Sequence, residues 1–365
     1  MTGHEVRRGA PAMTDRVLLL TPSRGMGGGI ERYAESLESA FASQGIQYAR
    51  IDLHDGSRQP RAMAHARVLA RSRRQLKDSR MPTRLVVTHR ALLPATSLLA
   101  RAPSVTGASV VCHGIDIWSR RSGARWHIEK RLLRSPKVRV VAVSSFTSGA
   151  LSAVCPATVL PPGLSQHWFD LLVEASTAAR IHSPGFHVVT AFRLASWRDK
   201  GLPQLLAAIA SLGRSDIHLT VCGSGIPPPE LQEEVRAYSQ CSLMPGLTDA
   251  ELADQLASAD LFVLATRTRT GRDASGEGFG LVLLEAQVAG TPVIAPAYGG
   301  SSGAYIDQLT GIAPTGESVE ALARALDGLL GDPMRLKQMG GYAAEWASVS
   351  FAPDRYASLA VARLL

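Results

Sequence analysis

The chain has 365 residues, of which 45% are hydrophobic and 19% charged, enough to bury the cores of two globular domains of about 150–200 residues each. No run approaches the roughly 18 apolar residues of a membrane span, and no apolar segment follows the arginines near the amino end. We therefore expect a cytoplasmic protein without a signal peptide. The formal net charge of +8 is uneven, because residues 1–180 carry +14 and residues 181–365 carry −6. This asymmetry indicates two modules with different partners.

The first half alternates β-prone runs with helical sequence. Residues 17–21 form a short apolar strand, a glycine-rich loop follows Pro22, and apolar residues then recur at helical spacing from Ile30 to Phe41. A strand, a glycine loop and a helix in this order open a doubly wound domain. Residues 157–163, which are rich in proline, are predicted to link the two halves. Further strands are predicted at residues 85–88, 109–112 and 138–143.

The second half repeats the alternation. Strands are predicted at residues 187–192, 218–222, 260–265 and 292–295, and helices at 202–212, 251–259, 280–289 and 319–330. Strands that alternate with helices form largely parallel sheets covered on both faces, so we predict an α/β protein with two Rossmann-like, doubly wound domains that face a central cleft. The predicted units are residues 1–163, residues 164–350 and a terminal helix at 351–365 that can cross back onto the first domain.

A glycine-rich segment of the second half offers an anion site. Gly276, Gly278 and Gly280 permit a tight loop, and a helix begins near Gly280. The free N–H groups and the positive dipole end of that helix suit a diphosphate. Glu277 and Glu285 flank this loop, and their carboxylates can accept hydrogen bonds from a hexose on one side and a ribose on the other. The alternative for Glu285 is a solvated position on the helix surface.

The segment EGFGLVLLEAQVAGTPVIAPAYGG, which contains both glutamates, resembles the signature of the retaining glycosyltransferases of family 4, which have the GT-B fold. Further similar segments lie in that family's order, so that the resemblance covers residues 17–351. They are GGGIERY (27–33), CHGID (112–116), VSSF (143–146), LPPG (160–163), Arg193 with Lys200 and Gly201, and GSG (223–225). The flank RTRTGRDASGE (267–277) is similar to bacterial phosphatidylinositol mannosyltransferases.

The resemblance implies roles for particular side chains. Glu277 would contact the transferred sugar and Glu285 the ribose, while Arg193 and Lys200 would neutralise the diphosphate. Fixed cations at that place also make physical sense alone, because negative charge develops on the leaving nucleotide. His113 would approach the donor sugar. Donor-binding positions are implied at Gly28, Gly29, Gly223, Gly225, Gly278, Phe279, Gly280 and Leu281.

Two assignments stay open. The spacer Ala-Ser-Trp-Arg at residues 195–198 departs from the family's usual acidic or proline-bearing spacer, so Arg198 is a further candidate for the phosphate role. Asp116 either belongs to the site or caps a helix ahead of Trp118.

Other functional classes account for less of the sequence. The first glycine loop reads G-M-G-G-G rather than GxGxxG, and Asp52 is the remaining candidate for a dinucleotide-binding acid, which argues against a dehydrogenase. A GT-B sugar-nucleotide epimerase would not carry the EGFG signature. No nucleic-acid partner is predicted, because helix-turn-helix, RNP and zinc-finger signatures are missing. We also expect no metal or cofactor, since there is no Asp-x-Asp triplet and neither the histidines nor the four isolated cysteines, Cys112, Cys155, Cys222 and Cys241, have metal-ligand spacing.

The donor, a nucleotide-sugar, is left open between GDP-mannose and a UDP-hexose, and the acceptor between a lipid-linked, glycolipid or polysaccharide hydroxyl and a soluble small molecule. Residues 58–84 hold nine basic residues against Asp78, and a second basic cluster spans residues 120–139. This charge predicts that the first domain docks on the anionic inner face of the cytoplasmic membrane, the alternative being a solvated surface. A thin apolar stripe is predicted to assist, formed by Val68, Leu69, Leu76 and Met81.

Overall fold

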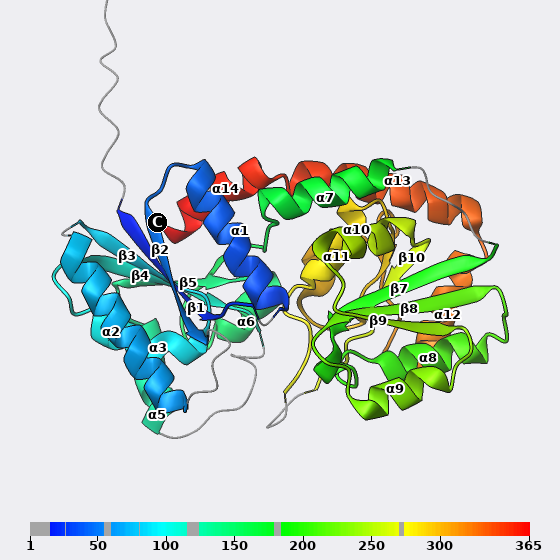
Figure 1. Ribbon diagram of the computed structural model, residues 1–365, viewed down its shortest axis with the longest axis horizontal. Helices are drawn as coiled ribbons and strands as arrows, with labels where there is room; N and C mark the ends of the chain where they lie inside the picture. Colours follow the sequence, from blue (N-terminus) through cyan, green and yellow to red (C-terminus); the bar gives the residue numbers. More distant parts are fainter. Residues whose placement is uncertain are drawn as a thin grey trace, which may run out of the picture.

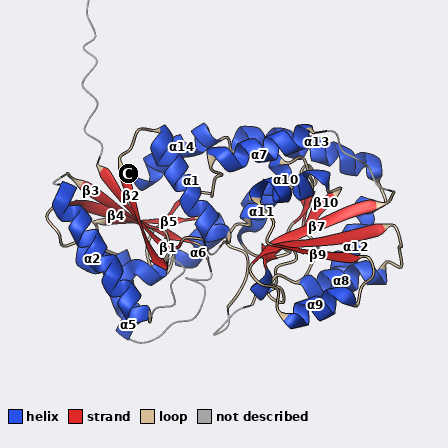
Figure 2. Cartoon of the chain, in the orientation of Figure 1, coloured by secondary structure: helices blue, strands red, loops and turns tan. Residues whose placement is uncertain are grey.

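The computed structural model describes residues 15–25, 27–54, 60–79, 81–114, 124–178, 184–269 and 274–365. Within these ranges two six-stranded parallel sheets lie next to each other, and helices cover both faces of each sheet (Figures 1 and 2). The predicted α/β fold with two Rossmann-like domains is confirmed.

The first sheet has the strand order β2-β1-β3-β4-β5-β6. Its strands are β1 (Arg16–Ser23), β2 (Tyr48–His54), β3 (Thr83–Val87), β4 (Val105–Cys112), β5 (Val138–Ala142) and β6 (Thr158–Val159). The helices of this half are α1 (Gly29–Ser43), α2 (Arg61–Ser79), η1 (Arg90–Leu92), α3 (Leu93–Leu99), α5 (Ala124–Leu133), α6 (Ser145–Leu151) and α7 (Gln166–Thr177).

The apolar run of β1 is continuous because both faces of the sheet are buried. Successive side chains of a strand point to opposite faces. Val17 accordingly packs in one cluster with Tyr33 and Leu37 of α1, whereas Leu18 packs in the opposite cluster with Val68 of α2. All of these side chains are 1% exposed or less. A strand buried on both faces loses the alternation that would mark it as half-buried.

The second sheet has the order β12-β11-β10-β7-β8-β9. Its strands are β7 (Phe186–Arg193), β8 (Ile217–Ser224), β9 (Cys241–Pro245), β10 (Leu261–Val263), β11 (Val293–Ile294) and β12 (Gly311–Ile312). The helices are η2 (Leu194–Ser196), α8 (Leu202–Ser211), α9 (Pro229–Arg236), α10 (Asp249–Ser258), α11 (Leu281–Val288), η3 (Gly300–Gly303), α12 (Val319–Leu330), α13 (Pro333–Ser350) and α14 (Pro353–Leu364). The chain leaves β7 toward β8 on one side and returns to β10 on the other, so a topological switch point lies at the carboxyl end of β7.

The end of the chain returns to the first domain. Helix α14 lies against α1 (Figure 1), and the carbonyl oxygen of Leu364 accepts hydrogen bonds from Arg84 Nε at 2.8 Å and Ser109 Oγ at 2.5 Å. The Tyr356 ring lies so close to Gly163 that a Cβ there would come within 2.2 Å of it. Helix α13 packs against α11 and α12 of the second domain, so α13 and α14 together connect the two domains.

Two expectations need correction. Residues 157–163 are not a plain linker, because Thr158 and Val159 form β6, which pairs with β5 at the edge of the first sheet. The apolar stripe expected on the membrane side of α2 is also wrong: Val68 and Leu76 are buried in the core beneath that helix, and Leu69 packs against the same core. A helix on a sheet turns its apolar face inward, so α2 leaves mainly charged residues on its outer face. Among the side chains of α2 that the structure describes, the exposed basic ones are Arg71, Arg73, Arg74 and Lys77.

Candidate active site

The glycine loop of the first domain reaches the carboxyl end of β7 in the second. Gly27 and Gly28 have φ values of 67° and 106°, which favour glycine, and Glu31 accepts a 2.7 Å hydrogen bond from the Gly27 N–H. The Arg193 guanidinium donates to the Gly27 carbonyl oxygen at 2.5 Å. A Cβ on Gly28 would lie 2.7 Å from this guanidinium, so the contact requires glycine. The loop and the predicted phosphate-binding arginine therefore face the same cleft.

Lys200 and Glu277 are brought together at the switch point. Lys200 Nζ donates to Glu277 Oε2 at 2.7 Å, and Thr266 Oγ1 donates to the same oxygen at 3.2 Å. The side chains of Lys200 and Glu277 keep 26% and 15% of their surface exposed, so both remain accessible from the cleft. A cation next to a carboxylate suits a ligand that carries a phosphate and sugar hydroxyls side by side.

Helix α11 begins in this same cleft. Gly280 is its N-cap with φ 84°, and no side chain caps the helix, so its first N–H groups can meet an anion. Phe279 is 3% exposed, and its ring packs edge-on against Phe351 at 6.2 Å. Neither the ring nor the backbone of Phe279 is therefore open to solvent. Leu281, the first residue of α11, is 9% exposed.

His113 follows β4 and faces the loop that precedes α11. Its Nε2 lies 2.9 Å from the Thr88 carbonyl oxygen, and since a carbonyl only accepts, Nε2 carries the proton. The Tyr33 ring packs edge-on against the imidazole at 5.0 Å. A Cβ on Gly278 would lie 1.8 Å from the His113 carbonyl oxygen. The two domains thus touch backbone to backbone at this point.

Glu285 is buried, with 6% of its surface exposed, and is not a solvated helix residue. Burial raises the pKa of this carboxyl, whereas the Arg32 guanidinium and the Trp168 indole hold the pKa down. Arg32 comes from α1 of the first domain, so the surroundings of Glu285 are built by both domains.

The glycines at the carboxyl end of β8 shape another wall of the second domain. A Cβ on Gly223 would lie 2.2 Å from the Phe192 carbonyl oxygen, and the Gly246 N–H donates to the Gly223 carbonyl oxygen at 2.9 Å. Gly225 has φ 90° with open space around it. These backbones lie next to the end of β7, with which β8 pairs in parallel.

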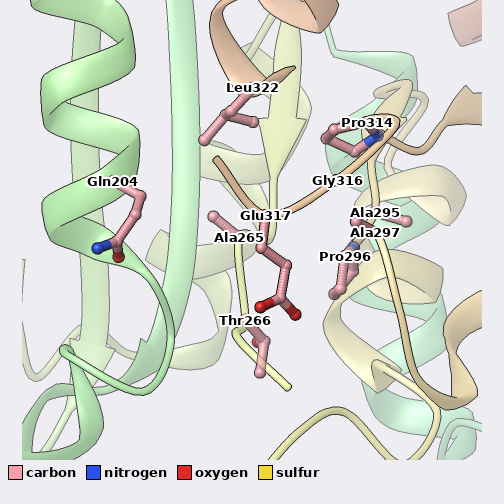
Figure 3. A pocket seen from close by; sticks show the side chains of 10 residues that line it. All are labelled: Gln204, Ala265, Thr266, Ala295, Pro296, Ala297, Pro314, Gly316, Glu317 and Leu322. Atoms are coloured by element: carbon pink, nitrogen blue, oxygen red, sulfur yellow. The ribbon is translucent and has the colours of Figure 1, made fainter. Parts of the chain in front are cut away.

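A small pocket opens behind Thr266 (Figure 3). Its walls are mainly apolar, with polar groups from Gln204, Thr266 and Glu317. Glu317 Oε1 accepts a hydrogen bond from the Thr268 N–H at 2.6 Å. Because Thr266 also bonds Glu277, this pocket shares a wall with the Lys200–Glu277 pair and extends the same site.

Comparisons with known proteins agree with this arrangement. Residues 187–346 match the family model described as "Glycosyl transferases group 1". Over 279 residues the chain is 36% identical to a GDP-mannose-dependent monoacylated alpha-(1-6)-phosphatidylinositol monomannoside mannosyltransferase of Corynebacterium glutamicum, covering 70% of each protein. The chain belongs to the group 1 glycosyltransferases.

Two more similarities extend this result. The glycosyltransferase is 33% identical over 281 residues to the GDP-mannose-dependent alpha-(1-6)-phosphatidylinositol monomannoside mannosyltransferase of Mycobacterium tuberculosis, covering 72% of this chain and 71% of that protein. The structure resembles a sucrose-phosphate synthase from Thermosynechococcus elongatus with a TM-score of 0.75 at 19% identity, covering 95% and 97% of the two chains. The GT-B fold and the resemblance to phosphatidylinositol mannosyltransferases, both predicted from the sequence, are confirmed.

Three other residues were candidates for binding roles on the basis of the sequence: Asp52, Arg198 and Asp116. The Asp52 carboxylate on β2 already accepts hydrogen bonds from Thr21, Arg24 and Arg50. It is therefore poorly placed to bind the ribose of a dinucleotide. Arg198 lies over the Trp197 ring at 4.1 Å, and its phosphate role stays a prediction. Asp116 lies outside the described residues.

The sequence did not point to Arg32, Trp168, Asp249 or Thr266 of the glycosyltransferase as site residues. Thr266 follows a strand end, a position that could have signalled a ligand site. Arg32 and Trp168 are ordinary helix positions, and no local pattern shows that they meet across the domain boundary.

Proposed function

We propose that this glycosyltransferase moves a mannosyl group from GDP-mannose to a hydroxyl of a phosphatidylinositol-type glycolipid, with retention of the anomeric configuration. The observation that carries the proposal is the pairing of Lys200 and Glu277 beside the open N-terminus of α11. The names of the two mannosyltransferases similar to this chain favour GDP-mannose over a UDP-hexose and a lipid over a soluble acceptor.

In this proposal the diphosphate lies between the α11 N-terminus, Lys200 and Arg193, under the Gly27–Gly29 loop. The bond between the sugar C1 and the phosphate oxygen breaks, the acceptor oxygen bonds to C1, and its proton passes to the leaving phosphate. Arg193 and Lys200 stabilise the negative charge that develops on that phosphate. Glu277 accepts from sugar hydroxyls, and His113 approaches the sugar from the first domain.

The acceptor side of the proposal uses the charge of the first domain. Helices α2 and α5 both contact α3 on the face of the first sheet that α1 and α14 do not cover. None of the described helices has the length and apolar character that a bilayer-spanning helix needs. Docking on an anionic lipid surface would therefore be electrostatic, at about 1 kcal/mol for each basic side chain near the lipid.

A thermal-shift panel tests the donor. The panel contains GDP-mannose, UDP-glucose, and dTDP- and ADP-linked sugars, each also as the free nucleoside diphosphate. A ligand at 100 times its dissociation constant adds about 2.7 kcal/mol to the free energy of unfolding. We expect the largest shift with GDP-mannose, followed by release of GDP when a phosphatidylinositol mannoside is added. A larger thermal shift together with turnover of a UDP-sugar would overturn the assignment of GDP-mannose as the donor. The absence of a thermal shift with every nucleotide would overturn the whole proposal.

A further inference from the structure

Four helices bring a charged cluster together at the domain boundary. Arg32 of α1 makes a two-pronged ion pair with Asp249 of α10, with nitrogen–oxygen distances of 2.7 and 2.9 Å. Its guanidinium also lies over the Trp168 ring of α7 at 4.3 Å. The buried carboxyl of Glu285 on α11 lies within the field of this cation, and Glu35 of α1 completes the cluster. One cation thus stands among three carboxyl groups.

Arg32 is the one member of this cluster that favours a charged Glu285 electrostatically. Burial raises the pKa of Glu285, and the nearby carboxylates Asp249 and Glu35 raise it further. The positive charge of Arg32 and the indole of Trp168 lower this pKa instead. A carboxylate accepts hydrogen bonds from two hydroxyls, whereas a protonated carboxyl has lost part of that capacity.

The placement of Arg32 depends on the relative position of the domains. α1 contacts β1 of the first sheet, whereas α10 contacts β7 and α11 contacts β11 of the second. Asp249 is the first residue of α10, which is held in place by a capping box between Thr248 and Glu251. The planar guanidinium is fixed by the carboxylate fork and by the indole face, so it has little freedom to turn elsewhere. The cation therefore stands beside Glu285 only in this mutual arrangement of the domains.

We propose that Arg32 is a positioning residue, which in this arrangement of the two domains holds its guanidinium beside Glu285 and so prepares Glu285 to accept the ribose hydroxyls of the donor nucleotide. Asp249 and Trp168 are the anchors that hold the guanidinium there. The inference rests on the proposed function, because it assigns part of the nucleotide site of the same enzyme. Beyond the proposed function, Arg32 of the first domain would then control how the second domain recognises the ribose.

The test compares two ligands by isothermal titration: GDP, and 2′,3′-dideoxy-GDP, which lacks both ribose hydroxyls. Wild-type enzyme should bind GDP more tightly. Arg32→Gln should lose on the order of tenfold in affinity for GDP and less than twofold for the dideoxy form, because hydrogen bonds to a charged group are lost. Arg32→Lys should recover part of the loss. The matched control is Arg214→Gln, which breaks a similar two-pronged pair with Asp216 away from the cleft and should change neither affinity.

The pH dependence of GDP affinity adds a measurement that would not change if Arg32 had only a structural role. The accepting form of Glu285 is the carboxylate, so GDP affinity is present above its pKa and is lost as the pH falls through it. Loss of Arg32 raises that pKa and should shift the fall in affinity to higher pH. If Arg32→Gln does not fold, Arg32→Lys, which keeps the positive charge but loses the two-pronged pair with Asp249, should show the same pattern more weakly.

The outcomes separate the two ideas. Equal losses for GDP and its dideoxy form at every pH would overturn the role of Arg32 while leaving the nucleotide site intact. If wild-type enzyme binds neither GDP nor UDP, the proposed function itself fails.

Discussion

Replacing Gly278 with alanine tests whether the enzyme works with its domains in the arrangement seen here. A Cβ at this position would lie 1.8 Å from the His113 carbonyl oxygen, whereas ordinary contacts begin near 3.4 Å, so the two domains must separate locally by about 1.6 Å. Both groups belong to the backbone, and neither can rotate away. The loop cannot retreat either, because a Cβ on Gly300 would already lie 2.0 Å from the Gly278 carbonyl oxygen.

A misplacement of about 1 Å between reacting groups can cost on the order of 100-fold in rate. We therefore expect Gly278→Ala to lower kcat about 100-fold, measured as GDP release from GDP-mannose in the presence of acceptor. Binding of GDP, the nucleotide of the proposed donor, should weaken by less than kcat falls, because most of its proposed contacts lie in the second domain. The thermal midpoint should fall modestly, because the new Cβ strains the domain contact by about 1–3 kcal/mol, while the backbone of Gly278, which does not have a positive φ, adds no strain of its own.

The matched control is Gly328→Ala in the last turn of α12, where a new Cβ meets nothing within 4 Å. This variant should be as active as wild type and slightly more stable, because glycine inside a helix costs about 0.5–1 kcal/mol relative to alanine. A kcat for Gly278→Ala within threefold of wild type would refute the reasoning, because catalysis would then not need this approach of the domains.

Three further predictions concern the reaction and its location. Lys200→Ala and Glu285→Gln should each lose most transfer activity while staying folded. For Lys200 the loss in transition-state stabilisation should be about 3 kcal/mol. Near-normal turnover of either variant would contradict the role assigned to that residue. The first-formed product should keep the donor's anomeric configuration in a proton NMR time course, and an inverted linkage would exclude a retaining mechanism. The enzyme should sediment with anionic vesicles at low salt and be released at high salt, and equal sedimentation of a variant without the basic face of α2 would rule out docking through that helix. That variant replaces Arg71, Arg73, Arg74 and Lys77 with serine.

The predicted membrane-docking face of α2 shows where a prediction from the sequence needed correction. The basic residues of α2 were visible from their density in the sequence, but three of the predicted contacts do not belong to an outer face. Val68 and Leu76 are core residues. Arg84 is on β3, and its guanidinium bonds the Leu364 carbonyl oxygen at the end of the chain. Periodicity predicts that a helix has an apolar face, but whether that face meets a sheet or a lipid depends on the neighbours.

The sequence by itself determined the alternation of strands and helices, the glycine loop at residues 27–29 and the segment from Glu277 to Glu285. Each of these depends on residues near one another in the chain: apolar periodicity, glycines in a tight loop, and an uncapped helix start. Their local structure was therefore readable, and helix α12 was predicted with the bounds that it has in the structure.

Only the tertiary structure decided which distant groups meet. Arg32 and Asp249 are 217 positions apart and form their ion pair because α1 and α10 face each other across the cleft. Likewise, the sequence placed Glu285 on a helix, but its burial depends on α1 and α7 packing over it. Local propensity carries no information about such encounters, since they follow from how the two sheets and the returning helix α14 bury their apolar faces against one another.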